Sequence, residues 1–148
     1  MESIIALLEQ ASEATIAVKS LSDDKKEDIL RALAAKLREN SMGILAENQL
    51  DLDRMPDTDP KKDRLLLTAA RIEDLAKSVE EIAALPDPSN RLLSEKILDN
   101  GLLVQKITVP LGVVGVIYES RPNVTVDVAA LCIQSGNVCL LRGGTDAF

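Results

Sequence analysis

Hydrophobic residues recur every three or four positions through the first 84 residues, which is the spacing of amphipathic helices. Ser22 followed by Asp23 and Asp24 indicates a helix start, because serine caps free amide groups and acids favour the positive end of the helix dipole. Two prolines and four charges between residues 55 and 62 predict a surface turn. The predicted helices span residues 2–20, 22–40, 41–54 and 63–84, the last with Ile72, Leu75, Val79 and Ile82 facing inward.

After residue 90 the pattern changes to short apolar runs separated by turn residues. Pro86 and Pro88 end the helical region, since neither can continue a helical hydrogen-bond ladder. Asn100-Gly101 lies between two apolar runs, which predicts a β-hairpin whose second strand extends to Val109. The remaining pattern predicts a strand over residues 113–118, a helix over 124–135 and a strand over 138–141.

The density of charged residues also changes in this part of the chain, near residue 100. Residues 1–99 carry the whole net charge of −7, whereas residues 100–148 hold three basic and three acidic residues that cancel. A segment with so few charges is expected to be buried on both sides, as in parallel α/β architectures. Tyr118 and Phe148 are the only aromatic residues, so the core must be aliphatic. The predicted fold class is therefore α/β, a helical layer followed by the opening strands of a Rossmann-like parallel sheet.

Composition removes several classes of function. The net charge of −7 argues against a nucleic-acid partner, because binding phosphates requires a basic surface. The sequence contains neither a secretory signal nor a run of about 18 apolar residues, so we expect a cytoplasmic protein with no membrane partner. Histidine is absent, which excludes a Cys/His or Ser/His catalytic pair and a histidine-based metal site within these residues, and we expect no metal.

Two loops are candidate functional sites. The first, around Asn123, follows a strand at the edge where ligands bind in open parallel sheets. The Asn123 amide is suited to stabilising an oxyanion, although the same residue after Pro122 is also suited to capping the next helix. The second loop, Arg142-Gly143-Gly144, combines a phosphate-pairing side chain with an approachable backbone; the alternative is an ordinary strand-exit turn.

Two other pairs of residues are interpreted structurally. Gly112 and Gly115 do not form a dinucleotide-binding fingerprint, because they flank or lie within a strand instead of opening a helix. We attribute both glycines to close backbone packing in a buried strand. Cys132 and Cys139 lie in apolar surroundings, where free cysteine behaves as a small buried hydrophobe, so neither is the expected nucleophile.

Several longer segments of the sequence resemble the gamma-glutamyl phosphate reductase family, a branch of the aldehyde dehydrogenase superfamily. These segments are VPLGVVGVIYESRPNVTVD and SGNVCLLRGG, with DRLLLTAARI and ALPDP upstream. ESRPNVTVD and LLRGG are specific to this branch, because more general aldehyde dehydrogenases carry a Pro-Trp-Asn loop and a Lys-Pro turn in these places. The resemblance extends over essentially all 148 residues.

The resemblance implies the second step of proline biosynthesis. In that reaction a cysteine thiolate attacks γ-glutamyl phosphate, phosphate leaves, NADPH delivers hydride to the thioester, and glutamate-5-semialdehyde departs. The resemblance gives Asn123 a role in the oxyanion hole, and it assigns the nicotinamide side of the cofactor to Ser120, Arg121 and Pro122. It assigns the adenosine ribose and its 2′-phosphate, and with them a preference for NADP over NAD, to Arg142, Gly143 and Gly144.

The resemblance also implies a division of the chain. Residues 1–90 correspond to the helical region, residues 91–109 to a hairpin that serves as an oligomerisation arm, and residues 110–148 to the start of the NADP-binding domain. The family's catalytic cysteine matches neither Cys132 nor Cys139 and belongs to a later domain, so a truncated and inactive chain is expected. A homo-oligomer and an association with glutamate 5-kinase are further implications.

Two alternatives remain open on the sequence alone. A non-catalytic helical interaction module with an enzyme-like tail agrees with the absence of histidine and of a plausible nucleophile. A fragment of another aldehyde or acyl-CoA dehydrogenase is less compatible with the words found at both loops.

Overall fold

The computed structural model describes residues 3–119 and 121–144 of the chain. These residues form six helices and two small sheets. The helices come first along the chain and the strands occupy its last third, as the sequence predicts. The helices are α1 (Ile4–Lys19), α2 (Asp23–Glu39), α3 (Ser41–Asp53), α4 (Lys62–Leu65), α5 (Ala69–Ala83) and α6 (Pro122–Gln134). The strands are β1 (Leu92–Ile97), β2 (Leu103–Ile107), β3 (Val113–Ile117) and β4 (Val138–Arg142).

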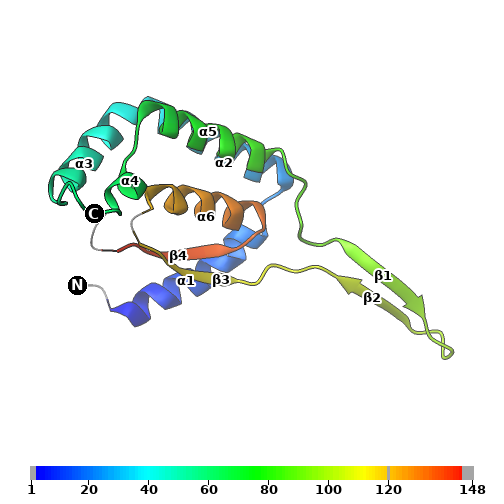
Figure 1. Ribbon diagram of the computed structural model, residues 1–148. Helices are drawn as coiled ribbons and strands as arrows, with labels where there is room; N and C mark the ends of the chain where they lie inside the picture. The colour runs from blue at the N-terminus through cyan, green and yellow to red at the C-terminus, as the bar shows by residue number, and fades with distance from the viewer. Residues whose placement is uncertain (1–2, 120, 145–148) are drawn as a thin grey trace.

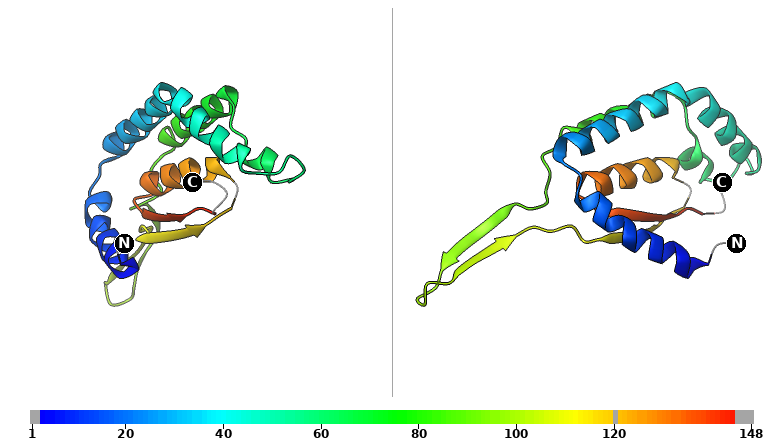
Figure 2. Two further views of the ribbon diagram at one scale, coloured as in Figure 1. Left: turned by 90° about the vertical axis from the view of Figure 1, so that its left-hand side faces the viewer. Right: turned by 180° about the vertical axis from the view of Figure 1, so that it is seen from behind.

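The elements form layers, with a hairpin extending from one end (Figures 1 and 2). Helices α2 and α5 lie side by side as the outer layer, α6 lies beneath them, and α6 in turn covers one face of the β3–β4 sheet. Helix α1 covers the opposite face. None of the described helices combines the length and apolar character needed to cross a bilayer. The mixed α/β class predicted from the sequence is confirmed.

The predicted helix starts are confirmed at one place and corrected at another. The Ser22 side chain accepts a hydrogen bond from the Lys25 amide at 3.3 Å and caps α2 as expected. The single helix predicted over 63–84 is wrong, because it is divided into α4 and α5. Leu66 leaves helical geometry with ψ of 122°, and the Thr68 side chain then caps α5 by accepting from the Arg71 amide at 3.1 Å.

The core lies between α2, α5 and α6 and is aliphatic, as the scarcity of aromatic residues requires. Leu30 and Val79 are fully buried, and small side chains let the helices approach closely. Ile72, Val79 and Ile82 face inward as predicted, whereas Leu75 is only partly buried because it borders two clefts described below. The buried cluster consists of Leu30, Ala34, Ala76, Val79, Ile82, Ala83 and Ala130.

Each sheet has two strands, and both pairings agree with the sequence pattern. Strands β1 and β2 pair in antiparallel fashion around the Asn100-Gly101 turn, with Ile97 opposite Leu103. Strands β3 and β4 pair in parallel fashion through the α6 crossover, with Ile117 opposite Arg142. Parallel pairing brings the carboxyl ends of both strands to one edge, where the two candidate loops begin.

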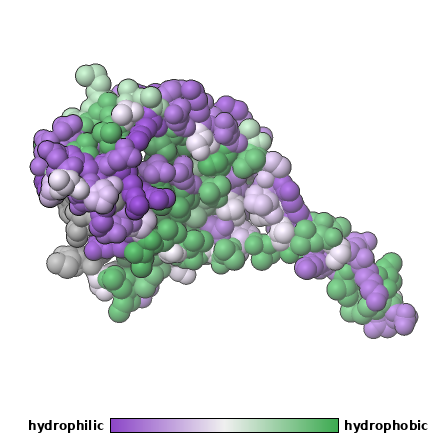
Figure 3. All heavy atoms as spheres, in the orientation of Figure 1, coloured by the Kyte–Doolittle hydropathy of each residue, from purple (hydrophilic) through white to green (hydrophobic). Residues whose placement is uncertain are grey.

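The expectation that residues 100–148 are buried on both sides is wrong for the described residues. Every residue of β2 is exposed, and on β3 the side chain of Ile117 is 86% exposed. β3 is partly exposed because β4 is the one described strand that pairs with it. β2 is exposed because the hairpin projects away from the helical layers. Figure 3 shows hydrophobic residues along the β3 edge and again on the hairpin.

The two strand glycines are not explained by close packing, which corrects the interpretation made from the sequence. A Cβ atom at Gly115 or Gly112 would meet no described heavy atom within 4 Å beyond its chain neighbours. Gly112 is instead required by its φ of +107°, which L-residues rarely adopt. In that conformation the Gly112 amide donates to the Asn137 side chain at 2.9 Å, and its carbonyl accepts from the Val138 amide at 2.9 Å. The two bonds fix the start of the parallel pair.

A buried ion pair anchors the base of the hairpin to the helices. Lys26 of α2 donates to the carboxylate of Asp87, and both side chains are at least 90% buried. Burial alone would raise the pKa of Asp87, but hydrogen bonds from Lys26 and Ser89 lower it to about 2. Arg91 at the first strand donates to the Asp87 carbonyl at 2.6 Å. Asp87 thus connects α2 to the start of β1, the strand that projects from the helical layers.

Candidate functional site

The candidate site lies where β3 and β4 end. The Tyr118 amide donates to the Arg142 carbonyl at 3.1 Å, so the two strand exits are adjacent. Gly144 passes close to the first exit, because a Cβ atom there would lie 3.2 Å from the Glu119 Cγ. Glu119 also pairs with Lys61 at 2.9 Å, which links this loop to the segment before α4. The expectation that both loops open on one sheet edge is confirmed by this register.

Asn123 does not cap helix α6, contrary to the alternative considered from the sequence. The helix begins at Pro122, one residue before Asn123 and two before the predicted start at Val124, and its N-cap residue Arg121 makes no capping bond with its side chain to a described residue. Proline is well suited to the first helical position because its missing N–H needs no partner there. Asn123 therefore lies within the first turn, and its amide nitrogen donates to the Asp127 carboxylate at 3.3 Å, one turn along the helix.

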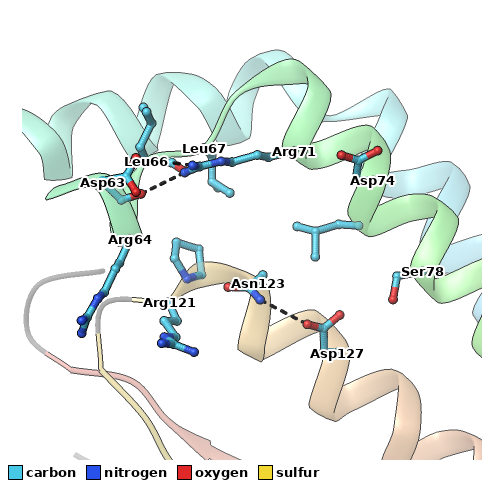
Figure 4. A pocket seen from close by; sticks show the side chains of 12 residues that line it. Asp63, Arg64, Leu66, Leu67, Arg71, Asp74, Ser78, Arg121, Asn123 and Asp127 are labelled. Carbon is cyan, nitrogen blue, oxygen red and sulfur yellow. Dashed lines mark hydrogen bonds and ion pairs between the residues drawn. The ribbon is translucent and has the colours of Figure 1, made fainter. Parts of the chain in front are cut away.

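Asn123 opens onto a cleft between α4, α5 and α6 with a volume of about 450 Å³ (Figure 4). Arg121 and Pro122 line the same cleft, so three of the predicted site residues meet there. Charged and polar side chains from α5 face them, including Asp74 and Ser78. The full lining is Asp63, Arg64, Leu66, Leu67, Arg71, Asp74, Leu75, Ser78, Arg121, Pro122, Asn123 and Asp127.

Arg71 holds one wall of this cleft in place. Its guanidinium donates to the carbonyl oxygens of Asp63 at 2.9 Å and Leu66 at 2.5 Å, and it pairs with the Asp63 carboxylate at 3.4 Å. These bonds close the turn between α4 and α5 at the place where the predicted single helix is interrupted. Arg71 is therefore committed to the protein's own backbone, and the cleft wall is preorganised.

A second cleft, with a volume of about 600 Å³, lies between α3, α5, α6 and the strand exits. Its lining is mainly apolar and includes Pro122, which borders both clefts, and Gly143 from the second predicted loop. The Tyr118 hydroxyl and Thr125 hydroxyl, both at this cleft, are hydrogen bonded at 2.5 Å. The two predicted loops thus open onto neighbouring clefts that share a proline.

The remaining predicted residues are placed as follows. Arg142 is the last residue of β4 and is exposed, and it lines neither of these two clefts. Gly144 follows it beside Glu119. Ser120 lies outside the described residues.

Both cysteines lie away from the clefts. Cys132 is buried in α6, and burial raises the pKa of its thiol, which disfavours the reactive thiolate. Cys139 is partly buried within β4. These positions agree with a structural role for both residues.

Sequence reasoning missed the contribution of the helical region to the site. Asp74 and Ser78 come from α5, and Asp127 lies four residues after Asn123. The four-residue spacing, which places two side chains on one helix face, was a usable signal for Asp127. Asp74 and Ser78 also share one helix face, but no local pattern indicates that this face meets the start of α6.

The chain is similar in sequence to curated gamma-glutamyl phosphate reductases. It is 51% identical over 146 residues to the protein of Chlorobium phaeobacteroides, and 50% identical over 140 residues to that of Legionella pneumophila. These alignments cover 99% and 95% of this chain but only 35% and 34% of the relatives. The chain therefore spans about one third of the length of the relatives it matches. No family model matches the chain.

Solved structures of the same enzyme have the same fold over this region. The crystal structure of gamma-glutamyl phosphate reductase from Thermotoga maritima superimposes with a TM-score of 0.92 at 32% identity, covering 99% of this chain and 36% of that one. The Saccharomyces cerevisiae structure gives a TM-score of 0.91 at 32% identity and covers 99% of this chain and 38% of that one. By sequence and by fold, this chain is a homologue of the gamma-glutamyl phosphate reductases.

Proposed function

We propose that this chain contributes the oxyanion-stabilising and cofactor-binding loops of an NADPH-dependent reductase that converts γ-glutamyl phosphate to glutamate-5-semialdehyde and phosphate. The names of its relatives support the reaction. The observation that carries the proposal is the position of Asn123, in the first turn of α6, at the carboxyl edge of a parallel strand pair and facing a charged cleft. Ligands bind at this edge in open parallel sheets.

The proposed role of Asn123 follows from its hydrogen bonds. A side-chain amide carries two N–H groups, and one of them is engaged by Asp127 at 3.3 Å. The other is available to the acyl oxygen of a substrate in the cleft. A donor of this kind, aimed at an oxygen that gains negative charge in the transition state, is worth about 2.7–4 kcal/mol in other enzymes.

The cofactor proposal rests on the second loop. NADPH, when bound, supplies the hydride that reduces the acyl group. Arg142 fits a phosphate-binding role because its guanidinium is exposed at the strand tip, and no ion pair is recorded for it among the described residues. Gly143 lines the cleft next to that of Asn123, and Gly144 follows it in the same turn. We assign the 2′-phosphate to Arg142, the ribose turn to Gly143 and Gly144, and the nicotinamide side to Ser120, Arg121 and Pro122.

We propose that neither Cys132 nor Cys139 is the catalytic nucleophile. The Cys132 thiol is buried with a raised pKa, which disfavours the thiolate that attack on an acyl phosphate requires. Cys139 lies within β4 and lines neither cleft. The proposal therefore places the catalytic cysteine outside residues 1–148.

The exposed hairpin supports a further part of the proposal. Every residue of β1 and β2 is exposed, and many of these residues are large and apolar. We assign residues 91–109 to contacts between subunits of a homo-oligomer. A cytoplasmic location and an association with glutamate 5-kinase complete the proposal, and both rest on the family alone.

The reaction is tested most simply in reverse with the complete protein. We expect NADP⁺ to be reduced when glutamate-5-semialdehyde and inorganic phosphate are both present, with NADP⁺ preferred to NAD⁺. Omitting phosphate is the control, because only an acyl phosphate reductase needs phosphate to release its acyl group. Phosphate-independent oxidation of the aldehyde would instead indicate an ordinary aldehyde dehydrogenase.

A further inference from the structure

The cleft beside Asn123 separates charges of opposite sign. Among its charged side chains, Arg71 and Asp63 are already paired with each other and with the α4–α5 turn. That pairing leaves two basic and two acidic side chains to face a ligand. In Figure 4 the acids Asp74 and Asp127 lie on the side of α5 and α6, and the arginines Arg64 and Arg121 lie on the side of α4 and the strand exit.

These four side chains have weak protein partners within the described ranges. Asp74 has its nearest recorded cation, Lys77, at 3.9 Å, and the Asp74 side chain is 76% exposed. Asp127 has Asn123 as its recorded partner, a neutral amide. No ion pair is recorded there for Arg64 or Arg121. The cleft therefore presents two separate, unneutralised charges of each sign to a ligand.

The position of Asp127 constrains the ligand further. Its carboxylate lies 3.3 Å from the amide nitrogen that we assign to the oxyanion. A negative charge so near opposes the charge that develops on the acyl oxygen, and the opposition is stronger where water is excluded. A ligand cation bound to Asp127 removes that opposition. The glutamyl group provides such a cation, because only two methylene groups separate its ammonium-bearing carbon from the acyl carbon.

We propose that Asp74 and Asp127 bind the α-ammonium group of the glutamyl substrate and so select glutamyl over glutaryl compounds. Arg64 and Arg121 face the anionic groups of the same ligand, and the acyl carbon lies at Asn123 between the two sides. This inference rests on the proposed function and adds the residues that recognise the substrate. A site built around a charge rejects the analogue that lacks it, because its own charges are then left unpaired.

Two ligands that differ only in the ammonium group test the inference. L-Glutamate and glutarate have the same carbon chain and both carboxylates, and glutarate lacks the amine. The 148-residue chain, labelled with ¹⁵N, is titrated with each ligand while the amide signals of Ser78, Asn123 and Asp127 are followed. We expect L-glutamate to bind at least tenfold more tightly than glutarate.

Charge-removing variants identify the acids responsible. Asp127→Asn keeps an oxygen that accepts from Asn123 but removes the charge, and Asp74→Asn removes the other charge. We expect each variant to reduce the preference for glutamate by about tenfold, which equals about 1.4 kcal/mol. Glu81→Gln is the matched control, because Glu81 lies on the same helix, is exposed and lines neither cleft, and its variant is expected to keep the wild-type preference.

The complete protein supplies a second measurement that also separates this inference from the proposed function. With phosphate and NADP⁺ present, Asp74→Asn and Asp127→Asn are expected to raise the KM for glutamate-5-semialdehyde about tenfold and to leave the KM for NADP⁺ unchanged. The inference would be overturned if glutamate and glutarate bound equally well. It would also be overturned if both variants kept the wild-type preference and the wild-type KM. In either case, phosphate-dependent activity of the complete protein would still support the proposed function. A complete protein without phosphate-dependent activity would overturn the function, and the binding preference would still decide the ammonium site.

Discussion

Helices α5 and α6 meet along a seam that is sealed at one end and open at the other. At the sealed end Ala130 of α6 is completely buried, in one hydrophobic cluster with Val79 and Ala83 of α5. At the open end the same two helices carry Asp74 and Asp127, and the space between them is the cleft beside Asn123. One pair of helices therefore provides both the rigid core and the charged wall of the candidate site.

The two ends of this seam are stabilised in different ways. The sealed end gains stability from aliphatic burial, which requires no partner beyond the helices themselves. At the open end Asp74 is 76% exposed, so water solvates its charge and the charge costs little stability without a close counterion. The aliphatic core therefore holds in place the polar groups to which we assign a binding role, and the variants below test the two ends separately.

The largest expected effect is at the sealed end. Leu30→Ala removes a fully buried side chain from the cluster of α2, α5 and α6 and should lower the free energy of unfolding by about 2–5 kcal/mol, because a cavity remains. Urea denaturation followed by circular dichroism measures the loss. A loss below about 1 kcal/mol would mean that the helices repack freely, and the cleft wall would then have no rigid support.

The buried ion pair at the base of the hairpin should make stability depend on acid. The pKa of Asp87 is about 2 in the fold against an ordinary value of 3.8, so its contribution is complete above 3.8 and is lost as the pH falls toward 2. A shift of this size corresponds to about 2 kcal/mol. Urea midpoints at pH 5 and pH 2.5 should therefore fall further in the wild type than in Asp87→Asn.

Glu27→Gln removes a half-exposed carboxylate, which pairs with Arg31, from the same helix as Lys26 and serves as the control. It should keep the acid dependence of the wild type. An identical acid dependence in the wild type and Asp87→Asn would show that the buried pair contributes nothing in solution.

The cofactor loop should discriminate between the two nicotinamide cofactors. Arg142→Ala in the complete protein should weaken NADPH about tenfold relative to NADH, because a charged hydrogen bond to the 2′-phosphate is worth about 1.5–3 kcal/mol. Dissociation constants from NAD(P)H fluorescence measure the ratio. Arg31→Ala, an exposed arginine of α2, should leave the ratio unchanged. If Arg142→Ala leaves it unchanged as well, the 2′-phosphate assignment is wrong.

The smallest effect is expected on the hairpin. Leu103→Ala changes the same residue type as Leu30→Ala, but Leu103 is 50% exposed and should cost less than about 0.5 kcal/mol in the isolated chain. The same urea experiment gives the comparison. A cost near that of Leu30→Ala would indicate that the arm is already buried in solution, for instance against another subunit.

The sequence predicted local structure well where local chemistry decides it. The Ser22 cap, the Asn100-Gly101 hairpin and the parallel pairing of β3 with β4 were all accessible from residue patterns. The interruption at Leu66 was missed, because the run of leucines there continues a helical pattern and the bonds of Arg71 that stabilise the turn are tertiary. Burial was overestimated for β3, since its exposure depends on which strands lie beside it.

The candidate site was only half predictable for a related reason. Arg121 and Asn123 lie a few residues after β3, and Arg142 is the last residue of β4, so the general rule for parallel sheets indicates all three. Asp74 and Ser78 come from a helix about fifty residues earlier in the chain. Their position at the cleft depends on how α5 packs on α6, and no local pattern encodes that contact.

We propose that the Asn123 amide stabilises the negative charge that forms on the acyl oxygen of the substrate. Steady-state kinetics of Asn123→Ala in the complete protein test it most directly, with Asn100→Ala at the hairpin turn as the control. We expect kcat to fall by about 10²–10³-fold while the KM for NADP⁺ stays within twofold. Equal losses in kcat and in cofactor affinity, or an unchanged kcat, would contradict it.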